Sequence, residues 1–306
     1  MFLISGFYDE ATSDTDKQLE LIKKLGRKYL CPRGIGGKNI SDYTADEFER
    51  HIVPRLDAAG VKLSSLGSPI GKIQLNDDEA YARQLNKLKE LIKIANLTGC
   101  KYIRCFSFFA DAKTANDKTT KKKVTDRWKG FLETTEGGET ILLHENEKKI
   151  YGDVPERVLE LYGALNHPHF KLCYDASNYI QCGIDPWKAY LDTREYTVYY
   201  HMKDCIDGVE VPLGMGDGRI ADIIEDLNKR GYDGFLTLEP HTAKYALLRK
   251  LFRLTPLCLT KYGKVFGKID KQMNKSAFES VGREEVFVWQ HDNLVKIIKE
   301  SGGLFE

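Results

Sequence analysis

Four apolar segments of the sequence end in a side chain that can bind a metal ion or move a proton. The runs ILLHENE, KLCYDASN, VYYHMKD and FLTLEPH contain, near their ends, Glu145, Asp175, His201 and Glu239. Three carboxylates brought together repel one another strongly unless a positive charge lies between them. Three oxygen donors and one imidazole suit a divalent cation of hard or intermediate character. The sequence therefore predicts one bound divalent metal ion, with Mn²⁺ expected first and Zn²⁺, Co²⁺ or Mg²⁺ as alternatives.

A metal ion held in this way supports proton transfer next to a carbonyl group. The ion polarises the carbonyl and acidifies the adjacent C–H bond, so that a carboxylate can remove the proton and leave an enediolate. Return of the proton to the same carbon gives epimerisation, and return to the neighbouring carbon gives isomerisation. Loss of a β-hydroxyl group gives dehydration. All three outcomes share the first step, so the residues leave them open.

The elements that position these residues follow a repeating pattern in which an amphipathic helix ends in glycine and a short apolar strand follows at once. Gly26, Gly60, Gly99 and Gly231 stand where a helix C-terminus favours a residue that tolerates a left-handed backbone. The expected strands are 2–5, 28–32, 61–67, 101–108, 140–146, 170–175, 196–203 and 234–240. The expected helices are 14–25, 44–59, 77–98, 117–134, 154–165, 185–192, 217–230 and 284–300, with a kink at Pro54 in the second.

Strict alternation of strands and helices predicts an α/β fold with a parallel sheet, and eight units predict closure into a single-domain (β/α)8 TIM barrel over 1–306. The alternative is an open doubly wound sheet, which usually has a glycine-rich turn after its first strand. Here that turn reads SGFYDE, with one glycine. In a barrel the C-terminal ends of all strands share one mouth, so the four metal-binding candidates face one volume.

Segment 242–282, between the eighth strand and the last helix, is longer than a barrel loop requires. It is basic and also carries many apolar residues. We leave open whether it is a helical surface excursion, a lid over the barrel mouth or an oligomer contact.

Composition narrows the classes of partner. The 306-residue chain has a formal net charge of +1, which gives it no overall electrostatic bias toward nucleic acid or a membrane, and we expect neither as a partner. Seven cysteines without a CxxC pair predict free thiols and a cytoplasmic location. The first residues, MFLISGFYDE, have neither the basic region nor the long apolar run of a signal peptide.

The segments HENEKKIYGD, YDASNYIQCGIDP, YHMKD and GYDGFLTLEPH resemble the sugar phosphate isomerase/epimerase members of the xylose isomerase-like TIM-barrel superfamily. The resemblance extends over nearly the whole chain except 242–282. It implies a cytoplasmic enzyme, a metal-dependent isomerase or epimerase of a sugar or sugar-like substrate, phosphorylated or not. It also implies that Glu145, Asp175, His201 and Glu239 are the metal ligands and that Glu145 and Glu239 are the catalytic acid/base pair.

Five further residues are expected to contact the substrate. Arg104 and Lys203 stand at strand ends with a positive charge, as do Arg33 and Lys72, and together such charges can hold a phosphate or carboxylate group. Asn178 stands where many epimerases of the superfamily have histidine; it can bind a hydroxyl group but cannot act as an acid. Glu147 follows the fifth strand, and His241 lies just beyond the eighth.

Two nearby features have alternative explanations. The loop GMGDGR places Gly214, Gly216 and Gly218 before a helix, where backbone amides can bind an anion. The loop can equally be a flexible turn whose Asp217 caps that helix. His144, next to Glu145, should face outward and pack under a helix, because neighbouring strand residues point to opposite sides.

Three other functions share this fold. A dehydratase or lyase of an inositol- or keto-type substrate differs from the isomerase only in its product. A non-catalytic sugar-binding barrel keeps the ligands without the chemistry. An apurinic endonuclease needs additional histidine ligands on the early strands, where this chain has none, because His51 is its first histidine and lies within a helical pattern. A homo-oligomer is compatible with the sequence.

Overall fold

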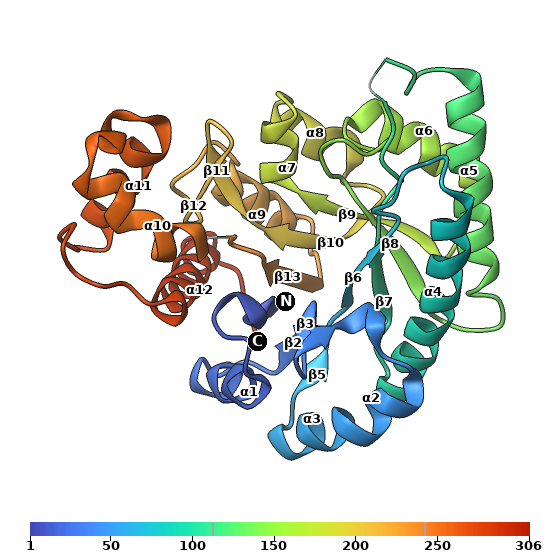
Figure 1. The fold of residues 1–306 in the computed structure, drawn as a ribbon, viewed down its shortest axis with the longest axis horizontal. Coiled ribbons are helices and arrows are strands. Elements are labelled where there is room, and N and C mark those ends of the chain that lie inside the picture. The colour runs from blue at the N-terminus through green and yellow to red at the C-terminus, as the bar shows by residue number, and fades with distance from the viewer. Residues whose placement is uncertain (112, 242) are drawn as a thin grey trace.

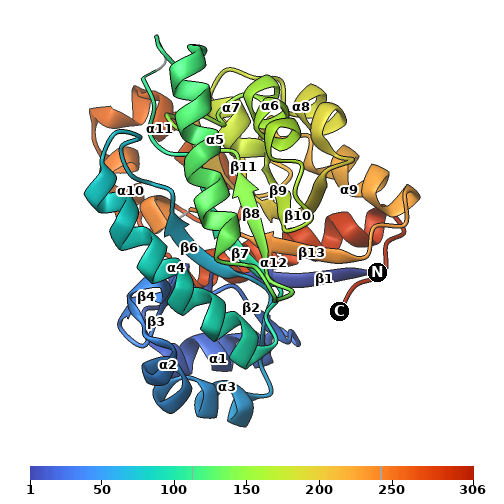
Figure 2. The ribbon, with the colours of Figure 1, turned by 90° about the vertical axis from the view of Figure 1, so that its right-hand side faces the viewer.

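Seven parallel strands form one curled sheet in the computed structural model, which describes residues 1–111, 113–241 and 243–306 (Figures 1 and 2). Their order is β1-β13-β10-β9-β8-β7-β6. The strands of this sheet are β1 (Phe2–Gly6), β6 (Leu66–Ile70), β7 (Tyr102–Cys105), β8 (Ile141–Glu145), β9 (Phe170–Asp175), β10 (Thr197–Met202) and β13 (Gly234–Leu238). The first and last strands of this order are connected through a short strand pair, so that the sheet curls into a barrel.

The pair consists of β2 (Tyr29–Leu30) and β5 (Lys62–Leu63), which run parallel to each other. The amide of Cys31 donates to the carbonyl of Gly6 at the end of β1, over 3.0 Å. On the other side, the amide of Gly67 in β6 donates to the carbonyl of Pro32, also over 3.0 Å. The expected third strand, 61–67, is therefore divided between β5 and β6, and the expected barrel is confirmed.

The helices lie around the outside of the strands (Figure 1). Their bounds are α1 (Thr15–Lys24), α2 (Ala45–His51), α3 (Val53–Ala59), α4 (Asp78–Thr98), α5 (Lys118–Glu133), α6 (Pro155–Leu165), α7 (Ala176–Gln181), α8 (Pro186–Thr193), α9 (Ile220–Lys229), α10 (Ala243–Leu254), α11 (Lys261–Gln272) and α12 (Arg283–Glu300). No helix in the described ranges is both long and apolar enough to cross a membrane.

The expected helix 44–59 is two helices, α2 and α3, which meet at Ile52. Pro54 occupies the first turn of α3, where its missing N–H group costs no hydrogen bond. The kink expected from proline is thus a complete break. Thr44 begins α2 with a reciprocal capping box in which Glu47 is the partner, as its sequence predicts.

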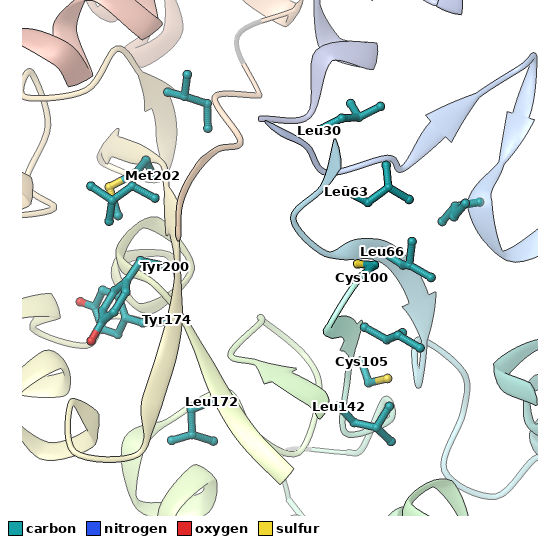
Figure 3. Close-up of a cluster of buried hydrophobic side chains, with 14 of the residues drawn as sticks. Leu30, Leu63, Leu66, Cys100, Cys105, Leu142, Leu172, Tyr174, Tyr200 and Met202 are labelled. Atoms are coloured by element: carbon teal, nitrogen blue, oxygen red, sulfur yellow. The ribbon is translucent and has the colours of Figure 1, made fainter. Parts of the chain in front are cut away.

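Side chains alternate between two layers along the strands. Outward-facing residues pack between the sheet and the helices, as Tyr174, Tyr200 and Met202 do in Figure 3. A smaller cluster built on Leu143, Cys173 and Tyr199 is separate from this layer. Because side chains on one face are two residues apart, the residues two positions later on these strands share the inward face. Those residues are the metal-ligand candidates of β8, β9 and β10.

Several short elements were not expected. They are the hairpins β3 (Gly34–Ile35) with β4 (Lys38–Asn39) and β11 (Asp204–Ile206) with β12 (Val209–Val211), and the 3-10 turns η1 (Tyr8–Glu10), η2 (Ile40–Asp42) and η3 (Pro256–Leu259). α7 was also missed, since it begins directly after β9 without a loop.

The segment that interrupts the barrel pattern contains α10, η3 and α11; its first residue, 242, lies outside the described residues. Tyr245 and Phe266 of these helices pack with Val209 and Val211 of the β11–β12 hairpin in a second hydrophobic cluster. Figure 1 shows α10 and α11 at the edge of the molecule, beside this hairpin.

Candidate metal centre

Glu145, Asp175, His201 and Glu239 lie together at the carboxyl ends of four successive strands of the sheet. Glu145 ends β8, Asp175 ends β9, His201 lies in β10 and Glu239 follows β13. Each offers a ligand atom, and these atoms all lie within 4.8 Å of one another. All four side chains are buried, with at most 3% of the residue surface exposed. Three carboxylates in so little solvent require compensating positive charge.

Two cationic side chains supply part of this charge. Arg104 of β7 donates from NH1 to Glu239 Oε1 over 3.0 Å and lies 3.3 Å from Glu145 Oε2. Its other nitrogens donate to the carbonyls of Gly67 and Ser68, which fix the guanidinium against β6. Lys203 Nζ lies 2.9 Å from Asp175 Oδ2 and 3.7 Å from Glu239 Oε2.

The histidine lies between two of the carboxylates. His201 Nδ1 is 2.9 Å from Glu145 Oε1 and 3.2 Å from Glu239 Oε2. Burial by itself lowers the pKa of His201, but Cys173, Glu145 and Glu239 outweigh it and hold that pKa well above its ordinary value. A metal ion binds neutral imidazole, so its binding at this position would displace the proton.

The carboxyl groups are ionised to different degrees. Burial raises the pKa of Glu239, but Lys203, Arg104 and His201 together hold it well below the usual range. Burial raises the pKa of Asp175 to about 6, although Lys203 opposes that shift. The site thus favours negative charge most strongly at Glu239, where the cations converge.

The donor set fits a divalent cation. One oxygen of each carboxyl group accepts no hydrogen bond among the described residues: Glu145 Oε2, Asp175 Oδ2 and Glu239 Oε2. These three oxygens lie 2.9 to 3.3 Å from cationic nitrogens without accepting a hydrogen bond, so each keeps a lone pair with which it could bind a metal ion. Oxygen ligands with one imidazole suit Mn²⁺, Zn²⁺, Co²⁺ or Mg²⁺. The metal site remains a proposal, which this geometry supports.

Two asparagines hold the ligands in place. Asn146 pairs with the backbone of Asp175 through both ends of its amide, at 2.9 Å each. Asn178 donates from Nδ2 to the carbonyl of Asn146 over 2.9 Å and to Glu145 Oε1 over 3.3 Å. The Asn178 amide, expected to contact substrate, therefore also positions a metal-ligand candidate. Sequence analysis did not single out Asn146, although it lies next to Glu145.

The other residues expected to contact substrate lie at different depths. Arg104 and Lys203 are buried beside the four candidates. His241 is partly exposed at the end of β13, with Nε2 3.4 Å from Glu239 Oε1. Glu147 lies on the loop after β8 and pairs with Lys72 over 2.9 Å, outside the group of four ligand candidates.

Two acidic residues at the barrel mouth, Asp9 and Glu10, were missed as site residues; Arg33, which contacts both, is one of the basic residues predicted to be able to hold an anionic group. Arg33 NH1 lies 3.7 Å from Glu239 Oε1, and its Nε donates to Asp9 Oδ2 over 2.9 Å. Glu10 is buried and accepts the backbone N–H of His241 through Oε2 over 2.7 Å. Both acidic residues follow β1 closely, three and four positions after its last residue, Gly6. Arg33 and Asp9 also line an open cavity of about 410 Å³ next to the site.

The glycine loop binds an anion through its backbone amides, as one of the two explanations predicted, but the anion is a side chain of the protein itself. The backbone amides of Gly214, Gly216 and Gly218 donate to the buried carboxylate of Asp204, at 2.9 to 3.1 Å. An internal anion thus takes the amides that were expected to bind an external one. α9 begins at Arg219 without a side-chain cap, so Asp217 does not cap it.

His144 faces away from the site, as expected. It is fully buried against Trp128 and Phe170, and its Nε2 lies 2.9 Å from Ser107 Oγ. Burial lowers its pKa to about 3, so it is neutral at physiological pH.

Known proteins share this architecture. The sequence profile of the family described as xylose isomerase-like TIM barrel matches residues 14–255. The chain therefore belongs to the xylose isomerase-like TIM barrel family. No curated protein matches it by sequence.

Three solved structures illustrate the range of proteins on this fold. The IOLI protein with a bound zinc atom is 14% identical, with a TM-score of 0.69, over 98% of this chain and 99% of that one. The probable 3-DHS dehydratase AsbF of Bacillus anthracis is 16% identical, with a TM-score of 0.64, over 90% and 99%. D-allulose 3-epimerase of Methylomonas sp., in complex with D-allulose, is 14% identical, with a TM-score of 0.63, over 89% and 96%. At these identities the likeness establishes the fold alone.

Proposed function

We propose that this protein is a divalent-metal-dependent isomerase or epimerase of a sugar or sugar-like substrate. The observation that carries the proposal is the convergence of three carboxylates and one imidazole at the ends of β8, β9, β10 and β13, with three carboxylate oxygens lacking hydrogen bonds among the described residues. One protein with the same fold, the D-allulose 3-epimerase of Methylomonas sp., acts on a sugar.

Glu145, Asp175, His201 and Glu239 would hold the cation. When bound, a divalent cation polarises a substrate carbonyl and acidifies the adjacent C–H bond. Glu145 and Glu239 are the proposed acid/base pair, because carboxylates placed on two sides of the site can remove a proton and return it. They stand on β8 and after β13, the two outer strands of the four, so they can approach a substrate from different sides.

The surrounding charges favour an anionic substrate or intermediate. With a divalent cation present, Arg104 and Lys203 bring the positive charge of the site to four, against three carboxylates. A fixed excess of positive charge stabilises negative charge as it develops on the substrate. Arg104 is held by β6 and oriented toward Glu239, so in this proposal it acts on the base and Lys203 on the substrate.

Deuterium exchange from solvent tests the proposal at its first chemical step. Purified protein loaded with Mn²⁺ is incubated in D₂O with a panel of ketoses and keto-inositols, free and phosphorylated, and C–H exchange is followed by NMR. We expect exchange next to the carbonyl of at least one substrate. Glu145→Gln and Glu239→Gln should each abolish it, because each removes a proton acceptor.

Glu225→Gln is the matched control, since its carboxylate is exposed on α9, where it pairs with Lys229 away from the site. Exchange retained in either Glu145→Gln or Glu239→Gln removes that residue from the acid/base role. The product then distinguishes the alternatives: loss of water identifies a dehydratase, and metal binding without exchange on any substrate identifies a sugar-binding barrel.

A further inference from the structure

The segment 243–275, which contains α10, η3 and α11, differs in charge from the rest of the chain. It carries nine basic residues and one acidic residue, for a net charge of +8. Because the whole chain has a net charge of +1, all other residues together carry −7. The near-neutral total, from which we expected no membrane partner, thus conceals a strongly cationic region at the edge of the molecule.

The one acidic residue of the segment is paired with basic residues of the same segment. Asp270 of α11 is buried and accepts hydrogen bonds from Arg249 and Arg253 of α10, at 2.8 and 2.9 Å, and from the hydroxyl of Tyr245. This group of four polar residues, of which only Arg253 is partly exposed, fixes α10 against α11. It leaves the outer lysines of the segment without an acidic neighbour in the segment.

The outward side of α10 is apolar. Leu247, Leu251 and Leu254 are spaced four and three residues apart, which places them on one side of the helix. They are 71%, 49% and 44% exposed, and Tyr245 and Arg249 on the other side are buried. Leu248, Leu257 and Leu259 continue the exposed surface, which we call the leucine face. It contains six of the twelve exposed large hydrophobic side chains of the described residues.

The outward side of α11 is basic. Lys261, Lys264, Lys268 and Lys271 recur at three- and four-residue intervals and are exposed. We call these four residues the lysine row. None of them, nor Lys244 or Lys250 beside the leucine face, makes an ion pair with another described residue.

We propose that the leucine face and the lysine row dock this protein on an anionic lipid surface. An interfacial helix buries an apolar side at the boundary between headgroups and acyl chains while nearby lysines contact anionic headgroups. α10 has this arrangement, with Lys244 and Lys250 on either side of its leucines. A membrane surface complements both the exposed apolar area and the excess positive charge.

A second copy of the chain fits less well. A two-fold contact through this region would bring two sets of unpaired lysines together, and an isologous interface cannot avoid that repulsion. A head-to-tail contact would need an apolar partner surface, but Leu97, Leu191 and Leu304 are scattered over other elements. Among the described residues, no hydrogen bond or ion pair joins 243–275 to the four ligand candidates, so the region is separable from the proposed chemistry.

Vesicle co-sedimentation tests the proposal on the full-length protein. The vesicles contain phosphatidylcholine alone or phosphatidylcholine mixed with phosphatidylserine. We expect binding to the anionic vesicles only, weakened by high salt because the lysine contribution is screened. The combined variant Leu247→Ser, Leu251→Ser, Leu254→Ser should bind more than about tenfold more weakly, as should Lys261→Gln, Lys264→Gln, Lys268→Gln, Lys271→Gln.

Matched controls carry the same changes elsewhere on the surface. They are Leu97→Ser, Leu191→Ser, Leu304→Ser for the leucines and Lys89→Gln, Lys101→Gln, Lys118→Gln, Lys129→Gln for the lysines, and both should bind as the unchanged protein does. Circular dichroism checks that each variant is folded. Because all four substituted lysines are exposed, the lysine variant still tests the proposal if the leucine variant unfolds.

Three results would overturn the proposal. The first is no binding to anionic vesicles. The second is full binding by the folded leucine variant, which would show adhesion by charge alone. The third is a dimer in solution that dissociates in the leucine variant without any vesicle binding, which would show that a second copy covers the leucine face.

Discussion

At the scale of single residues, the charged side chains at the strand ends have different roles in the site. Glu145, Asp175 and Glu239 are the proposed oxygen ligands, whereas Arg104 donates hydrogen bonds to Glu239 and to backbone carbonyls. Unlike Arg104, Lys203 makes no hydrogen bond to the backbone in the described part of the chain, and it lies against two of the carboxylates. It is therefore the residue best placed to contact an anionic intermediate.

Substitution of Lys203 tests this assignment. We expect Lys203→Met to lower kcat by about 10²- to 10³-fold, because a fixed positive charge is lost where negative charge develops. Metal stoichiometry, measured by elemental analysis, should stay near that of the unchanged protein. Lys72→Met at the rim is the control and should have little effect. Loss of metal from Lys203→Met would mean instead that the lysine serves to hold Asp175.

The identity of the four ligand candidates could be predicted because each ends an apolar run, and barrel topology brings such ends together. The ion pairs that Arg104 and Lys203 form with these carboxylates could not be predicted. Arg104 and Glu239 are 135 residues apart, and their contact depends on the inclination of strands that no local pattern encodes. Glu10 was missed as a site residue for the same reason, since its contact with His241 exists only in the closed barrel.

At the scale of elements, the loop between β12 and α9 is held by one buried carboxylate. Asp204 accepts four backbone N–H groups, from Cys205, Gly214, Gly216 and Gly218. A Cβ atom on Gly216 would lie 2.2 Å from Asp204 Oδ1, so the close approach requires glycine there. From sequence the glycines indicated an anion site correctly, but not that the anion belongs to the chain.

Asp204→Asn should destabilise this loop strongly. An amide has one acceptor oxygen and brings an NH₂ group toward backbone donors, so we expect a loss of about 2–4 kcal/mol in the free energy of unfolding. Urea unfolding measures it. Asp207→Asn, at the exposed tip of the neighbouring hairpin with a φ of 52°, is the control, since asparagine tolerates that backbone. Equal stability of the two variants would contradict the role assigned to Asp204.

At the scale of the whole molecule, the two ends of the chain are joined. Glu306 and Leu304 pair with Phe2 through their backbones. Arg27, just after α1, donates from Nε to His291 Nε2 of α12 over 3.0 Å. Burial lowers the pKa of His291, and the Arg27 bond requires an unprotonated Nε2, so the folded protein keeps this histidine neutral.

This contact predicts a pH dependence of stability. Because the pKa is lower in the folded than in the unfolded protein, the unfolded chain binds a proton first as the pH falls below about 6.5. Stability is therefore fully present above that pH and is lost below it, by up to about 1.4 kcal/mol per pH unit for this one group. The loss between pH 7.5 and 5.5, from urea unfolding, should be smaller in His291→Gln. His51→Gln, on the exposed side of α2, should leave it unchanged; the same loss in both variants would contradict the account.

The barrel could be predicted, because the sequence shows eight expected strands in alternation with eight expected helices, and several of these helices end in glycine. The structure of segment 242–282 could not be predicted from the sequence, because its apolar and basic residues fit a lid, an oligomer contact or a surface excursion equally. The position of its two helices depends on long-range contacts, namely the hydrogen bonds to buried Asp270 and the packing of Val265 and Phe266 against β12. The seven cysteines are all free, in keeping with the cytoplasmic location that remains a prediction.

The central claim is that Glu145, Asp175, His201 and Glu239 bind one divalent metal ion. Elemental analysis tests it most directly, on protein loaded with Mn²⁺, Co²⁺ or Zn²⁺ and freed of excess metal by gel filtration. We predict close to one equivalent in the unchanged protein and in Glu147→Ala, and almost none in Glu239→Ala. No metal in the unchanged protein, or the same amount in Glu239→Ala, would contradict the proposed site and the enzymatic function built on it.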